Sequence, residues 1–480
     1  MSGPGSAGLD ASLLVGPPRK VGRIGWLAFL AFDLVLVALL PKATVLLAIT
    51  VAVLSVAALV RKPILAASVA VYGVPLLWPL VFLGQEQLVN YVPSVLLVLP
   101  LAAIAWDAVW EFPRFGDRVR QLLRSVRSPA FGVALLFGLW LGCREIGSPS
   151  PTYGGLKTYL YFVSTLPLLL VGLAYFGGEA SRRERAFSFF VRATLVLLFV
   201  FSIVGVWNSF AQYWESEGRI RVLGVNSIWV ARFTGVGILL ASSAWVGRRL
   251  RTAVAIPLLA TFGVTFYLAG SRGPLLALLL AMVMWWTLGG RVKGRALVAA
   301  ALGILATLFL LAVEFGWVLE GSPLSAHEGS NMVRALLLKV VYDQGLTPGL
   351  FGLGTGGFAA AAGVGDIRVY PHNILLEIWV ELGVVGVLLL FAWLGVLCRT
   401  TVLRWREAAM FDGNAVPPRP GSLFPTERSR LRILATLTLY AFVNAQFSGD
   451  IGANQNLWFW AGLLTAPVLA GRSRPRGDLR

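Results

Sequence analysis

The chain has 480 residues, of which 57% are hydrophobic and 13% are charged, and its formal net charge is +18. Apolar runs long enough to cross a bilayer recur along its length, which excludes a set of soluble domains and predicts a polytopic membrane protein. In such a protein the excess of arginine is better explained by cytoplasmic loops than by nucleic-acid binding.

The hydropathy pattern predicts an all-α protein with about 14 membrane-spanning helices, within a range of 12–14. The predicted spans are 24–40, 43–60, 64–84, 89–110, 128–142, 156–176, 187–210, 226–246, 252–269, 274–289, 296–314, 374–398, 431–448 and 456–470. With the N-terminus inside, inner segments hold 30 Lys and Arg residues and outer segments hold nine. This bias follows the positive-inside rule and places both termini in the cytoplasm.

These spans divide the chain into segments of different character. We expect a cytoplasmic tail at 1–23, helices 1–11 at 24–314 and a large outer loop at 315–373. Helix 12 follows at 374–398, a flexible cytoplasmic loop at 399–430, the last two helices at 431–470 and a second cytoplasmic tail at 471–480. The outer loop holds a helix candidate from Met332 to Tyr342. A loop of this length with its own helix is typical of a functional element.

A set of arginines departs from the inner bias and maps near the outer surface: Arg219, Arg221, Arg232, Arg272 and Arg334. Arginine near the apolar core is costly, so it usually faces a polar cavity or a partner. Guanidinium groups hold phosphate bidentately and stay charged, which favours a diphosphate ligand. The alternative is that each arginine reaches lipid headgroups or pairs with Glu215 or Glu217.

His372 directly precedes the twelfth predicted span, so its ring is expected at the outer interface. Imidazole, with a pKa of about 6.5, can accept a proton from a hydroxyl at neutral pH. Asn373, Glu377 and Glu381 follow at spacings of four on one helix face. Two glutamates inside a span are costly unless they face a polar interior or pair with a cation such as Arg232 or Arg272. They are candidates either to orient the histidine or the acceptor, or to form a buried structural ion pair.

A glycine-rich segment, Gly352-Leu353-Gly354-Thr355-Gly356-Gly357-Phe358, lies within the outer loop. It lacks the Gly-Lys-Ser/Thr ending of a phosphate-binding loop and follows no clear strand. We therefore interpret it as a tight turn, whose backbone amides remain available to phosphate. The outer loops offer no strong acidic metal site, because Asp343 and Asp366 are isolated in the sequence.

The order of these motifs resembles the O-antigen ligase and O-antigen polymerase superfamily of bacterial membrane glycosyltransferases. The resemblance runs from Arg219 to Gly386. It rests on Ser271-Arg272-Gly273, on the arginine that begins the outer loop, on the glycine-rich segment and on His372-Asn373-Ile374-Leu375-Leu376-Glu377 leading into Glu381-Leu382-Gly383. It implies a fold of the GT-C type, with the large helical loop on the periplasmic side of the bacterial inner membrane.

By the same resemblance, the donor is a glycan on undecaprenyl diphosphate. Arg272 and Arg334 would hold the diphosphate, assisted by Arg219, Arg221 or Arg232. His372 would activate the acceptor hydroxyl, with Asn373, Glu377 and Glu381 as orienting candidates. Transfer would invert the anomeric carbon and use no metal and no cofactor. The acceptor would be the lipid A–core or a second lipid-linked glycan.

Two alternatives stay open. A ligase and a polymerase share this chemistry and differ in the acceptor. A lipid-linked oligosaccharide flippase also fits many spans with intramembrane cations, but it would be expected to show pseudo-symmetric halves and cations along a central cavity. The clustering of arginines at one face and the interfacial histidine favour the enzyme.

Overall fold

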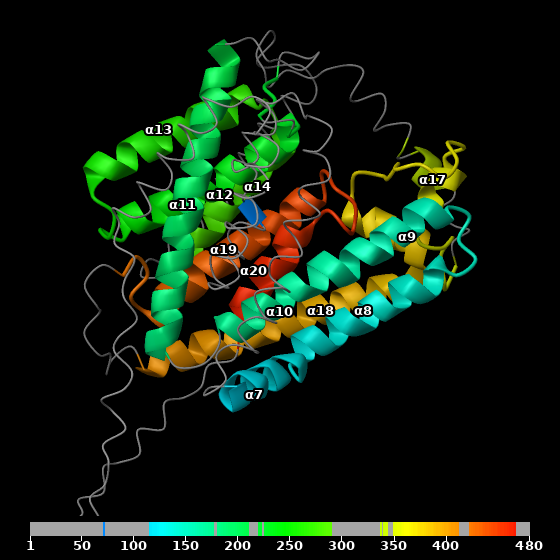
Figure 1. Ribbon diagram of the computed structural model, residues 1–480, viewed down its shortest axis with the longest axis horizontal. Helices are drawn as coiled ribbons and strands as arrows, with labels where there is room; N and C mark the ends of the chain where they lie inside the picture. Colours follow the sequence, from blue (N-terminus) through cyan, green and yellow to red (C-terminus); the bar gives the residue numbers. More distant parts are fainter. Residues whose placement is uncertain are drawn as a thin grey trace, which may run out of the picture. The chain divides into compact units, whose positions relative to one another are not determined.

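The computed structural model describes residues 71–72, 115–176, 180–210, 219–222, 225–289, 337, 339–343, 349–411 and 422–466 (Figure 1). All of them belong to one compact unit that begins at Leu59. Within these residues the regular structure is helical, apart from one isolated bridge between Val222 and Val225.

The helices follow one another along the chain, with gaps where residues are not described. They are α7 (Phe115–Val126), α8 (Pro129–Glu145), α9 (Pro151–Leu160), the π-helical turn η4 (Tyr161–Thr165), α10 (Leu166–Tyr175), α11 (Ala180–Phe210), α12 (Ser227–Val246), α13 (Thr252–Leu268), α14 (Arg272–Leu288), α17 (Gly357–Ala361), α18 (Ile374–Phe411), α19 (Glu427–Ala445) and α20 (Gln455–Thr465).

The predicted spans from 128–142 to 274–289, and the three from 374 onward, each coincide with described helices. The spans at 24–40, 43–60, 89–110 and 296–314 lie outside the described residues, as does 64–84 apart from 71–72. Among the described helices, four stretches are long and apolar enough to cross a membrane: Pro151–Ala174, Arg183–Trp207, Ser227–Val246 and Ile374–Ala409. The chain therefore has the architecture of a helical membrane protein.

Local sequence signals set several helix ends. Ser128 caps α8 by accepting a hydrogen bond from the Phe131 amide, and proline follows at the first helical position. Asn226 caps α12 in the same way. Thr426 and Ser429 form a reciprocal capping box at the start of α19. α18 continues to Phe411, beyond the predicted end at 398, because apolar length marks only the part of a helix that lies in lipid.

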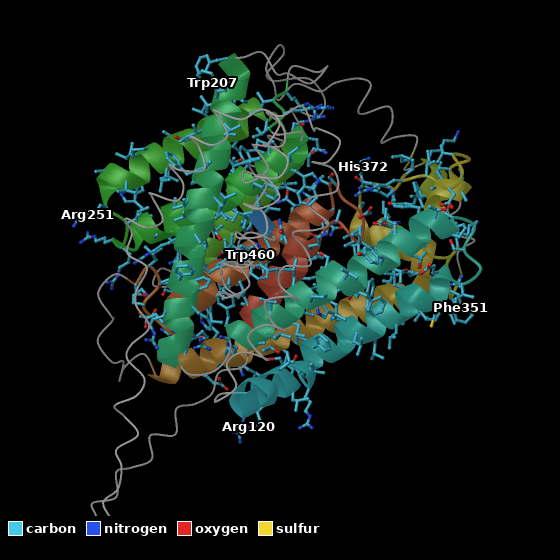
Figure 2. All side chains as sticks on the ribbon, viewed as in Figure 1. Arg120, Trp207, Arg251, Phe351, His372 and Trp460 are labelled. Carbon is cyan, nitrogen blue, oxygen red and sulfur yellow. The ribbon has the colours of Figure 1, made fainter. Side chains whose placement is uncertain are left out.

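Two hydrophobic cores share the helices α10 and α20. One core joins them to α11, α12, α13, α14 and α19, and the other joins them to α8, η4 and α18. Trp460 packs into the first core, whereas Trp458 packs into the second. The ring centroids of Trp458 and Trp393 are 4.1 Å apart. Because α20 is apolar on all sides, it can be buried in the interior of the bundle, where Figure 2 shows Trp460.

The exposed surface of the helix bundle is apolar as well. Exposed leucine, valine, isoleucine and phenylalanine side chains lie on α8, α11, α13 and α18: Leu136, Leu139, Val196, Val200, Ile256, Val264, Leu388 and Phe391. A soluble bundle of this kind would present polar side chains there. The exposed faces are consistent with contact to lipid chains.

Backbone hydrogen bonds join the outer loop to α18 at a break in this helix. Gly383 has φ 66° and ψ −162°, which interrupts the helical hydrogen bonds. The glycine-rich segment takes up the freed carbonyls: the Leu353 amide donates to Val380 O (2.8 Å) and the Gly354 amide to Glu381 O (3.0 Å). In return, the Val385 amide donates to Leu350 O (3.3 Å). The loop therefore satisfies backbone groups that lipid would leave unpaired.

The expected helix in the outer loop is present where the structure describes it, at 337 and 339–343. Leu337 and Val341 are buried against Phe358 and Val380. This contact fixes one part of the loop to the first turns of α18. The rest of the helix candidate, including Arg334, lies outside the described residues.

Candidate active site at the start of helix α18

His372 lies in the last residues of the outer loop, directly before α18 (Figure 2). Its φ of 56° places it in the left-handed region, which a non-glycine residue rarely adopts. The ring is half-buried, and its centroid is 4.6 Å from that of Tyr370. Strain of this kind, of order 1–3 kcal/mol, is characteristic of functional sites.

Asn373 caps the helix that follows. Its side-chain oxygen accepts hydrogen bonds from the amides of Leu375 (3.0 Å) and Leu376 (3.1 Å). This arrangement fixes where α18 begins and hence where His372 is presented. Asn373 therefore orients the histidine segment through the backbone.

Glu377 and Glu381 are fully buried, and their cation is Lys157 of α9. The Lys157 Nζ lies 2.5 Å from Glu377 Oε1 and 2.6 Å from Glu381 Oε1. The glutamates do pair with a cation, but this cation is Lys157 and not one of the suggested arginines, Arg232 or Arg272, because α9 rather than α12 or α14 presents a cation to this face of α18. We call Lys157, Glu377 and Glu381 the lysine triad; its formal charge is −1.

The lysine triad is also tied to the glycine-rich segment. The Gly356 amide donates to Glu381 Oε2 (2.8 Å), and Lys157 lies 4.4 Å from the centroid of the Tyr153 ring. The amides of Leu353, Gly354, Thr355, Gly356 and Gly357 all donate within the protein. The segment is thus the tight turn that the sequence predicted, and these amides are not available to phosphate.

The turn between α19 and α20 carries a buried carboxylate, Asp450, that the sequence analysis missed. Its Oδ2 accepts hydrogen bonds from the Tyr153 hydroxyl (2.9 Å) and from Arg368 Nε (3.2 Å), and its Oδ1 accepts from the Ala453 amide (2.7 Å). Burial raises the pKa of the Tyr370 hydroxyl, and the negative charge of Asp450 adds to this effect. Asp450 therefore links the α19–α20 turn to the segment that leads into His372.

Arg232 of α12 also donates hydrogen bonds to the turn between α19 and α20. It is almost fully buried in α12, and its Nη2 donates to the carbonyls of Asn444 and Ser448, while Nη1 donates to Asn454 Oδ1 (3.2 Å). Its guanidinium also lies 4.6 Å from the centroid of the Trp229 ring. The terminal nitrogens of Arg232 thus hold the turn in place.

Arg272 reaches this neighbourhood at the start of α14. The next residue, Gly273, packs so closely against Phe447 of the turn that an added Cβ would lie 2.6 Å from the Phe447 Cβ. Arg219 and Arg221 flank Ile220, whose amide donates to Leu268 O (3.3 Å) at the end of α13. Arg219 is half-buried and Arg221 is exposed. Arg334 lies outside the described residues.

Arg232 and Gly273, the residue after Arg272, thus both contact one turn, residues 446–454. Arg368, four residues before His372, also contacts Asp450 of this turn. Three neighbours were overlooked in the sequence: Lys157, Arg368 and Asp450. A signal for two of them was present, because Lys157 is a charged residue at the start of the otherwise apolar predicted span 156–176 and Asp450 is a single acid between two apolar helices. Within the described ranges, no three His, Cys, Asp or Glu side chains are placed to hold a metal ion together.

The comparison with protein families adds one finding. Residues 257–391 match the family model described as O-antigen ligase. This segment contains Arg272, Arg334, His372, Asn373, Glu377 and Glu381, and it leaves out Arg219, Arg221 and Arg232. The predicted resemblance to the O-antigen ligase and polymerase superfamily is therefore confirmed over this segment. No curated protein matches the chain.

Proposed function

We propose that this protein is a membrane glycosyltransferase that moves a glycan from undecaprenyl diphosphate to an acceptor hydroxyl at the periplasmic face of the bacterial inner membrane. The proposal rests on one observation: His372 lies within the O-antigen ligase match and also has a strained backbone conformation. The O-antigen ligase match contains His372, and His372 is held in a strained backbone conformation beside a polar turn at one end of an apolar bundle.

In this proposal His372 takes the proton from the acceptor hydroxyl as that oxygen attacks the anomeric carbon. The bond to the lipid diphosphate breaks with inversion, and the leaving group carries away the electron pair. Arg272 and Arg334 bind the departing diphosphate, since fixed guanidinium groups stabilise charge that develops in the transition state. Arg219 and Arg221 assist in binding the diphosphate. No metal and no cofactor takes part.

Arg232, Asn373 and Asp450 act as positioning residues. Arg232 fixes the α19–α20 turn through its carbonyls, Asp450 ties that turn to Arg368, and Asn373 sets the start of α18. His372 lies between the segments that Arg368 and Asn373 hold. Its orientation therefore depends on both contacts.

The test is reconstitution of the full chain with a lipid-linked repeat unit. Lipid-linked products longer than the donor, formed without any other acceptor, identify a polymerase. Product that forms only after lipid A–core is added identifies a ligase. If neither condition yields a transferred glycan, the proposal fails.

His372→Ala should lower transfer by about 10²–10⁴-fold, because that is the usual contribution of a general base. The chain offers a matched control, His327→Ala, at its only other histidine, to which the proposal gives no role. Initial rates of transfer, together with equal melting temperatures for both variants, measure the effect. Wild-type rates in His372→Ala would remove the histidine from the mechanism.

A further inference from the structure

A second buried cluster of charge lies far from the candidate active site. Arg404 is roughly 45 Å along α18 from its start at Ile374, at about 1.5 Å per residue. There it meets the first turns of α11 and α19, so that Arg183, Arg404, Arg430 and Glu427 gather at one place. We call these four residues the arginine cluster. The charge pattern of the sequence places this end of the helices at the cytoplasmic face.

One carboxylate serves three guanidinium groups. Glu427 Oε2 lies 2.5 Å from Arg183 Nη2 and 3.1 Å from Arg430 Nη2, and Oε1 lies 2.6 Å from Arg404 Nη2. The arginine side chains are only 5–8% exposed, and that of Glu427 is 18% exposed. The cluster therefore has a formal charge of +2 that little water reaches. Buried charge of this kind normally has a counter-ion.

Several nitrogens of the cluster remain unused. Arg430 Nη1 donates to the Phe424 carbonyl, and Arg404 Nη1 donates to that of Leu464. In contrast, Arg183 Nε, Arg183 Nη1 and Arg404 Nε are buried and have no hydrogen-bond partner among the described residues. Both oxygens of Glu427 already accept hydrogen bonds. The unused donors thus lack an anionic acceptor among the described residues.

We infer that the arginine cluster binds a phosphate group at the membrane face opposite to His372. A phosphate carries one negative charge as a diester and close to two as a monoester, and its oxygens accept charge-assisted hydrogen bonds from guanidinium groups. Two guanidinium groups with unused donors, on α11 and α18, supply contacts from two directions. The phosphate comes either from an anionic phospholipid headgroup or from a free phosphate in the cytoplasm.

Binding would also join three helices. Arg183 belongs to α11, Arg404 to α18 and Glu427 to α19. A bound phosphate would reduce repulsion among the guanidinium groups while each keeps its contact with Glu427. The expected result is a protein that is more resistant to unfolding when phosphate is present.

The first arm of the test uses inorganic phosphate. The full chain is purified in detergent in a phosphate-free buffer, and its melting temperature is followed by tryptophan fluorescence as phosphate replaces chloride at constant ionic strength. We expect a saturable rise in wild type. Arg183→Gln removes the residue with two unused nitrogens while Glu427 keeps Arg404 and Arg430, and it should weaken the apparent affinity by about tenfold or more.

Two further variants make this arm decisive. Arg251→Gln removes an exposed arginine at the start of α13 and should respond like wild type. Arg183→Lys keeps a positive charge beside Glu427 but removes the guanidinium donors, so it covers the case in which Arg183→Gln fails to fold. An Arg183→Lys protein that binds phosphate as tightly as wild type would overturn the inference.

The second arm separates the two sources of phosphate. The protein is reconstituted in nanodiscs of phosphatidylcholine with or without phosphatidylglycerol, and bound lipid is counted by native mass spectrometry after release. Phosphatidylglycerol retained by wild type and Arg251→Gln, but lost from Arg183→Lys, identifies a lipid headgroup. A response to inorganic phosphate alone identifies a free phosphate. If wild type responds to neither probe, the inference is wrong, and the proposed function is unaffected.

Discussion

The lysine triad and the arginine cluster solve the problem of buried charge in opposite ways. In the triad one ammonium lies between two carboxylates, at 2.5 and 2.6 Å, and a backbone amide adds a further hydrogen bond. In the arginine cluster one carboxylate lies among three guanidinium groups, and buried donors are left over. Each cluster leaves some buried polar atoms without a hydrogen bond among the described residues, but of opposite kinds: carboxylate oxygens of Glu377 in the triad, and guanidinium nitrogens of Arg183 and Arg404 in the arginine cluster. The triad carries a formal charge of −1 and the arginine cluster +2, so only the arginine cluster is suited to an anion.

Of the substitutions that test this comparison, we expect Lys157→Met to have the largest effect on stability. Lys157→Met would leave Glu377 and Glu381 buried without a cation, and removal of one partner from a buried pair typically costs about 3–5 kcal/mol. We expect the free energy of unfolding in mixed micelles, followed by circular dichroism, to fall by that amount. Adding Glu377→Gln and Glu381→Gln to the same protein removes the charge and should restore most of the loss. A single variant as stable as wild type would show that Lys157 does not stabilise the two carboxylates.

Glu427→Gln should have a smaller effect on the same measurement. Glu427 is 18% exposed, and two of its arginines retain contacts with backbone carbonyls, so we expect a loss of about 1–3 kcal/mol. Added phosphate should recover part of this loss, but it should recover none in Lys157→Met. Equal behaviour of the two variants toward phosphate would contradict a phosphate site that is confined to the arginine cluster.

The contact of the lysine triad with the glycine-rich segment can be tested at Gly352. Its φ is +74°, and an added Cβ would lie 2.5 Å from the backbone of Glu381. Gly352→Ala should therefore cost about 1–3 kcal/mol of unfolding free energy beyond the backbone strain, because the added methyl group overlaps the Glu381 backbone. Gly363→Ala is the matched control, because its φ of +72° is similar and nothing lies within 4 Å of the added Cβ. A loss no greater than that of Gly363→Ala would mean that the close packing contributes nothing.

The smallest expected effect on stability is that of Asp366. Its carboxylate accepts hydrogen bonds from the amides of Tyr153 (2.9 Å) and Thr152 (2.8 Å) at the start of α9. The Tyr153 amide lowers the pKa of this carboxyl, with help from Thr152. Because the pKa is lower in the folded state, the stabilisation is fully present above the unfolded value of about 3.9 and is lost as the pH falls through the folded value. Melting temperatures of wild type and Asp366→Asn should therefore differ at pH 6 and converge at low pH. A constant difference would contradict this assignment.

Hydropathy predicted most of the described helices because an apolar run in lipid has essentially one solution, the α-helix. The span 252–269 coincides with α13, for example, and 274–289 with α14. Spacing also showed that Glu377 and Glu381 share a face. It did not show which helix that face meets, because Lys157 lies more than 200 residues away in sequence. Asp450 was missed for the same reason, since its partners Tyr153 and Arg368 belong to distant segments.

The break at Gly383 has a consequence for how the protein assembles. A continuous helix can enter the membrane with its backbone already satisfied, but the carbonyls of Val380 and Glu381 require amides from the outer loop. That loop precedes α18 in the chain, so it is synthesised first. The final hydrogen bonds of α18 form only when the loop packs against the break at Gly383. Folding of the loop and of α18 is therefore coupled, and His372 lies where the two meet.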